Sequence, residues 1–316
     1  MATEPRIAFV LGTGRCGSTL VHEVIARHPD VAFLSNLEDR LPLPAALGRW
    51  NNAVYRSLPA SFTRKGRLRF APSEGYRALD REVSPALSAP ERDLVAEDAT
   101  PWLAARTRAF VDRRAAAQGR PAFVHKLTGW PRAGFLDRVF PDARFVHVVR
   151  DGRAVANSFL QMTWWRGYEG PDAWGWGPLA PEDRAAWEAS GRRFPLLAGL
   201  EWKLLIDAYD RAAGLLPADR WLEVRYEDFV AEPREVTGRL LAFLGLEWEP
   251  RFERGFARYT FSGDRTQAYR ADLGDDDLAL LEGALVAHLG SRGYVGNDQA
   301  EDTIRSPGTN VRQGEG

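Results

Sequence analysis

Short apolar runs alternate with segments of helical periodicity along most of the chain. Each run is too short for a helix, and several are rich in β-branched residues, so the runs predict buried strands. They lie at Ile7–Leu11, Val31–Leu34, Ala122–Lys126, Arg144–Val149 and Trp221–Arg225. Strands that are separated by helices are typical of a parallel sheet with helical crossovers on both faces.

Helical spacing predicts the elements between these runs. In Ser18–His28, the side chains of Leu20, Val24 and Ile25 share one face, and Pro29 ends the helix. Further helices are predicted at Trp102–Gln118, Gly134–Phe140, Gly152–Met162, Leu196–Leu216, Pro233–Leu244 and Asp275–Leu289. The predicted fold class is therefore α/β, with a parallel sheet between two layers of helices. Ligands of such sheets bind at the carboxyl ends of the strands.

Two segments lack clear periodicity. Residues 37–100 are dominated by proline, arginine and small residues, which predicts an insertion with short helices. Residues 163–182 combine glycines with several tryptophans, which favours an aromatic-walled pocket or lid over a layer of the core. The tryptophans concerned are Trp164, Trp165, Trp174 and Trp176.

These segments suggest a domain organisation. We expect residues 1–296 to form a single domain, with insertions at about residues 40–100 and 160–195 that shape a binding pocket. Residues 297–316 are polar and glycine-rich, and we expect them to be a flexible tail.

Composition narrows the functional classes. The 316 residues are 45% hydrophobic, enough for a sizeable core, and the formal net charge is −1. A near-neutral chain has no broad basic field for nucleic acid, so an anionic ligand must be held by a local cluster. The single cysteine, Cys16, excludes an intramolecular disulfide and favours a reducing compartment, so we expect a cytoplasmic location. The first residues do not resemble a signal peptide, and no apolar run of about 18 residues predicts a membrane span.

The first predicted strand runs directly into a glycine loop and then a helix. In Gly12–Ser18, backbone N–H groups can converge on an anion, and the helix dipole adds to the attraction. Arg15 contributes a planar cation, while Ser18 and Thr19 contribute hydroxyl groups. The loop is close to the Walker pattern of Gly-x4-Gly-Lys-Ser/Thr. Ser18 stands where the lysine should be, which argues against the lysine and magnesium chemistry of a nucleotide triphosphatase.

A second candidate anion site follows the predicted strand Arg144–Val149. Arg150 lies at the end of this strand, and Ser158 comes eight residues later in the next helix. If the helix folds back beside the strand, both side chains can bind one phosphate. The alternative is a local ion pair between Arg150 and Asp151.

Together, these two segments resemble the PAPS-dependent sulfotransferases, where PAPS is 3′-phosphoadenosine 5′-phosphosulfate. The resemblance implies a three-layer sandwich around a P-loop-type parallel sheet, and a sulfuryl transfer from PAPS to an acceptor hydroxyl that leaves 3′,5′-ADP. It also implies that the first loop binds the 5′-phosphosulfate and that the Arg-x7-Ser pair, Arg150 and Ser158, binds the 3′-phosphate. The residues of the first loop concerned are Gly14, Arg15, Cys16, Gly17, Ser18 and Thr19.

Two further segments extend the resemblance. Leu222–Phe229, followed by Pro233, is similar to the family's strand and helix beside the adenine, which makes Tyr226 a candidate base contact. Lys126–Pro131 resembles the lysine-bearing strand end that faces the transferring group. For the last phosphate contact, the resemblance suggests a C-terminal loop, in which Ser262–Arg265 and Arg270 are the nearest candidates.

Sulfuryl transfer requires neutralisation of the leaving phosphate and a base for the acceptor proton. Arg15 and Lys126 are the candidate cations, and no metal is required. Many family members carry Lys-x-His, whereas here Lys126 is followed by Leu127 and Thr128. Other branches use a glutamate shortly after the first helix, so Glu38 is the preferred candidate base. Asp39 and then His125 follow, although His125 should face away from Lys126 because adjacent strand residues point to opposite faces.

Two other functions stay open. A P-loop nucleotide-dependent kinase would bind ATP with magnesium, and a non-catalytic protein of the same fold would bind 3′,5′-ADP without turnover. The acceptor is not identified by the pattern, because the tryptophan-rich segment suits an aromatic, lipid-like or carbohydrate molecule. The oligomeric state is likewise not predicted. The scattered histidines have no metal-ligand spacing.

Overall fold

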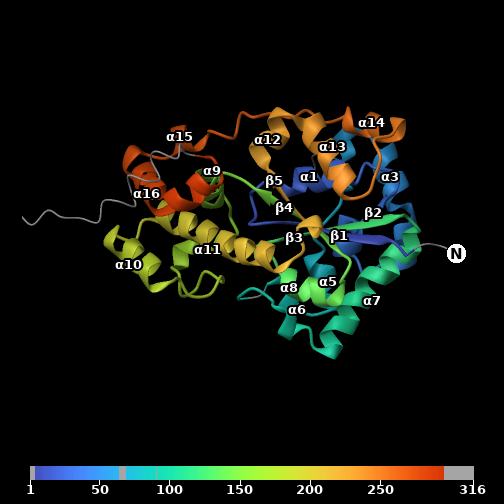
Figure 1. The fold of residues 1–316 in the computed structure, drawn as a ribbon, viewed down its shortest axis with the longest axis horizontal. Coiled ribbons are helices and arrows are strands. Elements are labelled where there is room, and N and C mark those ends of the chain that lie inside the picture. The colour runs from blue at the N-terminus through green and yellow to red at the C-terminus, as the bar shows by residue number, and fades with distance from the viewer. Residues whose placement is uncertain (1–3, 64–68, 90, 295–316) are drawn as a thin grey trace, which may run out of the picture.

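A five-stranded parallel sheet occupies the centre of the molecule, with strand order β2-β3-β1-β4-β5 (Figure 1). This computed structural model describes residues 4–63, 69–89 and 91–294, so the predicted tail, 297–316, lies outside the described residues. The strands are β1 (Arg6–Gly12), β2 (Val31–Ala32), β3 (Ala122–Thr128), β4 (Arg144–Val149) and β5 (Trp221–Arg225). All five predicted strands are confirmed. Only β2 is shorter than predicted, because the backbone N–H and carbonyl groups of Phe33 bond to the side chains of Gln118 and Asn51.

Helices cover both faces of the sheet, which confirms the predicted three layers (Figure 1). The apolar residues of β1 alternate between two cores, as a strand buried on both faces requires. Phe9 and Leu11 pack with side chains of α5, α7 and α8, whereas Ala8 and Val10 pack with side chains of α1, α12, α13 and α14. A third core forms around Trp202, at the end of the molecule opposite α14 (Figure 1). Its helices are α9 (Gly152–Leu160), α11 (Phe194–Leu215) and α16 (Asp275–Ser291).

The predicted long helices are present with small shifts at their ends. They are α1 (Ser18–Ile25), α7 (Pro101–Gln118), α8 (Ala133–Val139), α9 (Gly152–Leu160), α11 (Phe194–Leu215), α13 (Pro233–Phe243) and α16 (Asp275–Ser291). Proline is the first residue of α7 and α13, where its missing N–H costs nothing.

Short helices account for most of the remaining chain. In residues 37–100 they are α2 (Asn36–Arg40), η1 (Ala45–Trp50), α3 (Asn51–Ser57), α4 (Ala60–Thr63), α5 (Tyr76–Glu82), α6 (Pro85–Ser88) and η2 (Ala96–Asp98). Elsewhere they are η3 (Gly167–Glu169), α10 (Pro181–Ala189), η4 (Ala218–Arg220), α12 (Tyr226–Ala231), α14 (Pro250–Phe256) and α15 (Tyr269–Asp272). The expectation of short helices in the first insertion is therefore confirmed. The division into one domain with two insertions stays an interpretation of the sequence.

The carboxyl ends of the strands meet at one edge of the sheet. Gly12 at the end of β1 pairs with Thr128 at the end of β3, and Val149 of β4 pairs with Arg225 of β5. Parallel pairing places the loops that follow these strands side by side, although they are far apart in the sequence. This register positions the candidate site.

Candidate active site

A cavity of about 970 Å³ opens at the carboxyl edge of the sheet. Part of its lining comes from the loops after β1, β4 and β5 and from a C-terminal segment. We call this part the loop group: Thr13, Gly14, Arg15, Gly17, Ser18, Thr19, Arg150, Tyr226 and Arg265. A second part, the aromatic group, consists of Tyr76, Phe159, Trp164, Trp165, Trp174 and Trp176. The cavity thus has a cationic part and an apolar part.

The loop after β1 turns sharply before α1 begins. Gly14 and Gly17 have φ values of 87° and 92°, and Arg15 has a φ of 55°, all in the left-handed region. A side chain at Gly17 would also overlap the ring of Tyr226, so both conformation and space require glycine there. With this turn, the first N–H groups of α1, which have no partner within the helix, lie beside the cavity.

Three guanidinium groups converge beside this loop. Arg150 donates from Nη1 to the carbonyl oxygen of Arg15 at 3.1 Å and from Nη2 to that of Arg265 at 2.6 Å. Arg15 donates from Nε to the hydroxyl of Ser158 at 2.9 Å. The arginines of the two segments singled out in the sequence, Arg15 and Arg150, therefore both line one cavity, and Ser158 lies against Arg15.

The charges of these arginines are not compensated by the protein. Within the described parts of the chain, none of the three groups forms an ion pair with a carboxylate, and the buried Nε of Arg150 has no hydrogen-bond partner. Burial, followed by the positive charges of Arg150 and Arg265, lowers the pKa of Arg15. Asp151 instead pairs with Arg153 at 2.7 Å, which excludes the alternative ion pair with Arg150. The cluster attracts anions because like charges are held together without a counter-ion.

Lys126 lies beside the loop with a side chain that is only 2% exposed. Its Nζ donates to the hydroxyl of Thr19 at 2.6 Å and lies 2.5 Å from a carboxylate oxygen of Glu74. Burial alone would raise the pKa of Glu74, but the charge and hydrogen bond of Lys126 outweigh burial and lower it. Glu74 lines the cavity, so an ionised carboxylate faces the cavity next to a cation.

The predicted base Glu38 lies elsewhere. Its carboxylate accepts hydrogen bonds from the hydroxyl of Ser35 at 2.8 Å and from the side chain of Asn51 at 2.5 Å, and only 3% of Glu38 is exposed. Asp39 accepts from the backbone N–H of Ala78 at 3.1 Å. Neither carboxylate lines the cavity, because both stabilise the ends of short helices.

The third candidate base, His125, faces away from Lys126, as the alternation along a strand predicts. Its ring packs against Phe110 and Phe123 on the other face of the sheet. Burial, and secondarily the charge of Arg114, lowers the pKa of His125 to about 4. The imidazole is therefore neutral at pH 7 and outside the cavity lining.

Other predicted residues differ in their relation to the cavity. Cys16 is fully buried in the core below the loop and does not line the cavity. Arg270 lines a separate pocket of about 470 Å³ with Arg153 and Arg225, whereas Arg265 lines the main cavity. A cofactor contact of Arg270 stays a prediction from the sequence, whereas Arg265 is the C-terminal arginine that faces the loop group.

Comparison with known proteins identifies the family. The model of the sulfotransferase family matches residues 6–250. The chain belongs to the sulfotransferase family. Two Mycobacterium proteins, from M. bovis and M. tuberculosis, are both named omega-hydroxy-beta-dihydromenaquinone-9 sulfotransferase Stf3. Each is 29% identical over 121 residues, which span 36% of this chain and 26% of the relative.

Solved structures support the fold of this family member. Sulfotransferase STF9 from Mycobacterium avium has a TM-score of 0.56 and 17% identity, with 92% of this chain and 77% of that chain covered. Sulfotransferase STF1 from Mycobacterium tuberculosis has a TM-score of 0.50 and 19% identity, with 89% and 76% covered. At these identities, the similarity shows the sheet and its helices but not the acceptor.

The sequence reasoning missed Glu74, although local signals were present. Glu74 lies in Pro72–Gly75, a run of turn-forming residues just before α5, inside the insertion that lacks periodicity. The β-bridge from Ser35 to Pro72 places this turn next to the sheet edge. The contact between Glu74 and Lys126 joins residues far apart in the chain, so the spacing of residues in the sequence does not reveal it.

The described residues contain neither a membrane-spanning helix nor a metal-ligand cluster. No helix among them is long and apolar enough to cross a membrane. No group of three or more histidine, cysteine, aspartate or glutamate side chains in residues 4–63, 69–89 and 91–294 is arranged to hold a metal ion.

Trp165 connects the cavity to a buried acid. Its indole Nε1 donates to Glu201 at 2.8 Å, and Glu201 is 0% exposed. Burial raises the pKa of Glu201 to about 8, although the Trp165 hydrogen bond acts in the opposite direction. The folded protein therefore keeps this carboxyl protonated at neutral pH.

A pH dependence of stability follows for Glu201. Unfolding releases the proton when the pH lies between the ordinary value of 4.5 and the folded value of about 8, so the free energy of unfolding should fall over this range and level off above it. Glu201→Gln keeps a neutral acceptor and removes this titration. The Tm of the parent minus the Tm of Glu201→Gln should therefore decrease as the pH rises from 5 to 8. Parallel Tm curves for the two proteins would contradict the prediction.

Proposed function

We propose that this protein is a PAPS-dependent sulfotransferase that transfers a sulfuryl group to an acceptor hydroxyl and releases 3′,5′-ADP. The convergence of Arg15, Arg150 and Arg265 on one cavity, without carboxylate partners, carries the proposal. A nucleotide with anionic groups at both its 5′ and 3′ ends matches a cluster of this kind better than a single phosphate does.

Each end of the nucleotide has its own partners in the proposal. The loop N–H groups with Arg15, Ser18 and Thr19 bind the 5′-phosphosulfate, and Arg150 with Ser158 binds the 3′-phosphate. The hydrogen bond between Arg15 and Ser158 supports the closeness of the two proposed phosphate sites, since Arg15 belongs to the 5′ site and Ser158 to the 3′ site. Arg265, which lines the cavity, provides the last phosphate contact in place of Arg270.

Tyr226 is the proposed contact of the adenine. Its ring lies against Gly17, and the guanidinium of Arg150 lies 4.9 Å from the ring centroid. An aromatic face next to a cationic phosphate site suits a base that is attached to a phosphorylated ribose.

The proposed reaction is an in-line transfer. The acceptor oxygen forms a bond to sulfur while the bond between sulfur and the bridging phosphate oxygen breaks, and the acceptor proton passes to Glu74. Arg15 and Lys126 stabilise the charge that develops on the leaving phosphate, and Thr19 orients Lys126. Glu74 replaces Glu38 as the proposed base because it lines the cavity and is ionised beside Lys126.

The acceptor in this proposal is a hydroxyl-bearing small molecule, lipid or carbohydrate. The Mycobacterium relatives are named for a hydroxylated menaquinone, which supports a hydroxyl acceptor, although the match covers only a quarter of their length. A cytoplasmic location stays a prediction from the single cysteine.

Nucleotide binding tests the proposal directly. By isothermal titration calorimetry, 3′,5′-ADP should bind in the presence of EDTA, at least tenfold more tightly than 5′-AMP. PAPS should then give sulfated product, detected by mass, with at least one acceptor in a broad screen of alcohols, phenols and sugars.

The same experiments separate the competing functions. Tighter binding of ATP with magnesium than of 3′,5′-ADP would indicate a kinase and overturn the proposal. Binding of 3′,5′-ADP without release of 3′,5′-ADP from PAPS across the screen would indicate a non-catalytic protein. Because no metal enters the proposed step, EDTA should leave turnover unchanged.

A further inference from the structure

We propose that the acceptor is a neutral, largely apolar alcohol or phenol, held by the aromatic group, and not a carbohydrate or an anionic compound. This inference rests on the proposed function, since it concerns the same cavity. A volume of about 970 Å³ is at the upper end of the roughly 300–1,000 Å³ of ligand pockets. The cavity therefore has room for an acceptor next to the nucleotide.

Two of the four tryptophans in the aromatic group, Trp165 and Trp174, donate their indole N–H groups to the protein. Trp165 donates to the buried Glu201 at 2.8 Å, and Trp174 donates to the carbonyl oxygen of Gly177 at 2.7 Å. A buried indole N–H that already has a partner does not seek one on the ligand. What these two side chains add to the cavity is ring surface without free polar atoms.

Two of the cations near the aromatic group already pair with carboxylates. Arg69 pairs with Glu23, and Arg166 pairs with Glu169 at 2.5 Å. Arg132 is 2% exposed and donates to the carbonyl oxygens of Thr128 at 3.1 Å and of Trp130. An acceptor carboxylate or sulfate would have to displace Glu23 or Glu169 to bind the first two cations. Arg132 has no carboxylate partner among the described residues, but it is almost fully buried.

The polar groups that remain are few. The hydroxyl of Tyr76 lies 2.8 Å from that of Thr128 and accepts the N–H of Thr128 at 2.9 Å, so these groups satisfy one another. Among the described residues that line the cavity, none is asparagine, glutamine, aspartate or histidine. A carbohydrate ring would lose water from several hydroxyls without gaining partners, which is unfavourable for each unpaired group.

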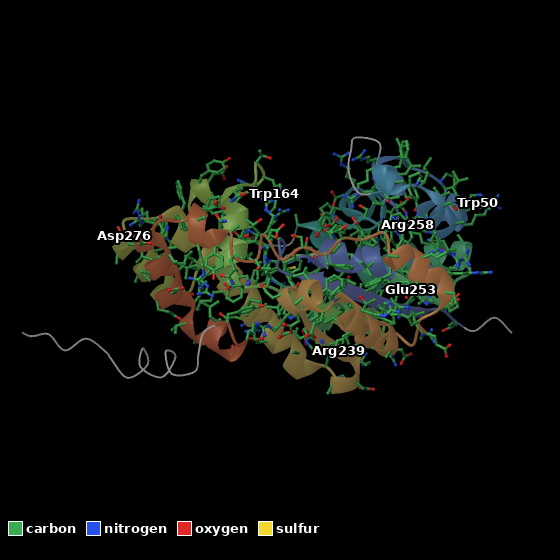
Figure 2. All side chains as sticks on the ribbon, turned by 90° about the horizontal axis from the view of Figure 1, so that it is seen from above. Trp50, Trp164, Arg239, Glu253, Arg258 and Asp276 are labelled. Carbon is green, nitrogen blue, oxygen red and sulfur yellow. The ribbon has the colours of Figure 1, made fainter. Side chains whose placement is uncertain are left out.

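The carboxylate of Glu74 can accept a hydrogen bond from a single acceptor hydroxyl. The carboxylate of Glu74 is 31% exposed and faces the cavity beside Lys126. An acceptor with one hydroxyl at the end of an apolar body would place that hydroxyl on Glu74 and its body against the tryptophans. Trp164, which is 53% exposed, lies between the end of the molecule that carries Asp276 and the end that carries Trp50 (Figure 2), so it is accessible to an entering molecule.

The test compares matched probes on the protein loaded with 3′,5′-ADP. The probes are 2-naphthol, its carboxylated analogue 6-hydroxy-2-naphthoate, the prenyl alcohol farnesol and methyl β-glucoside, each measured by equilibrium dialysis. We expect 2-naphthol and farnesol to bind at least tenfold more tightly than the naphthoate and the glucoside. The inference would be overturned if either polar probe bound as tightly as the apolar probes or more tightly. It would also be overturned if neither apolar probe bound.

Variants locate the binding. Trp176→Ala should weaken the apolar probes at least tenfold and leave the Kd of 3′,5′-ADP within about twofold. Trp102→Ala, a control at a tryptophan that is 60% exposed and outside the cavity, should change neither. If Trp176→Ala does not fold, Trp164→Ala serves instead, because its ring is largely exposed. Unchanged probe affinity in the folded variant would refute the assignment.

The order of measurements keeps the two proposals apart. The titration with 3′,5′-ADP comes first, and its failure would count against the proposed function. Normal binding of 3′,5′-ADP together with failure of both apolar probes would count against the acceptor class alone.

Discussion

Turnover by the Glu74→Gln variant is expected to be about 10²–10⁴-fold lower than that of the parent, with 3′,5′-ADP affinity nearly unchanged. The loss corresponds to removal of a positioned base, because glutamine keeps the size of the side chain but cannot take the acceptor proton. Steady-state kcat with a competent acceptor measures the effect. Calorimetry with 3′,5′-ADP checks that the nucleotide site is intact.

Glu38→Gln is the matched control for this prediction. Glu38 bonds to Ser35 and Asn51 outside the cavity, so its substitution should lower Tm but leave kcat within a few-fold. Turnover of Glu74→Gln within a few-fold of the parent, or a larger loss in Glu38→Gln, would assign the base to another residue.

The pH profile adds an independent readout for Glu74. Lys126 outweighs the effect of burial and lowers the pKa of Glu74, so the base is lost only as the pH falls below the ordinary range of a glutamate. The parent kcat/KM should therefore have an acidic limb below about pH 4.5, the usual value. This acidic limb should be absent in Glu74→Gln. If Glu74 had a purely structural role, the variant would keep the acidic limb at the same pH as the parent.

Arg150→Ala is expected to weaken 3′,5′-ADP by about 100-fold and 5′-AMP by less than about threefold. A charge-assisted hydrogen bond contributes roughly 1.5–3 kcal/mol, and Arg150 has a buried Nε without a partner as well as two bound nitrogens. Only the 3′-phosphate distinguishes the two ligands, so the ratio of the two losses reports on that group. Both are measured by calorimetry in EDTA.

Arg270→Ala is the control for Arg150. Arg270 was one of the two C-terminal arginines suggested from the sequence, but it lines the separate pocket, so its substitution should change neither affinity. Similar losses for 3′,5′-ADP and 5′-AMP in Arg150→Ala would mean that Arg150 supports the loop through the carbonyl groups of Arg15 and Arg265 and does not read the 3′ end.

The parts of the site that the sequence predicted share one property: the residues are close in the chain and follow a strand. The glycine loop with Arg15 follows β1, and Arg150 with Ser158 spans the end of β4 and the helix α9. In such segments, the order of residues and the direction of the strand already define which side chains meet. The prediction that His125 faces away from Lys126 is confirmed for the same reason, since alternation is a property of a single strand.

Glu38 and Glu74 show where this reasoning ends. Both lie in the segment without periodicity, and distance from the first helix favoured Glu38. The structure assigns Glu38 to a capping box with Ser35, a local role that its spacing also fits. Glu74 reaches Lys126 only because Ser35 pairs with Pro72 and the next turn enters the cavity.

By itself, the amino-acid sequence determined the parallel sheet, its two helical layers and the two arginine-bearing strand ends. These depend on periodicity and chain direction, which are local. Only the tertiary structure decided that Arg265 and not Arg270 lines the cavity, that Glu74 faces it, and that Trp165 and Trp174 donate their indole N–H groups to the protein. Those outcomes depend on contacts between residues far apart in the chain, where packing and hydrogen-bond satisfaction select one of several arrangements that the spacing allows equally.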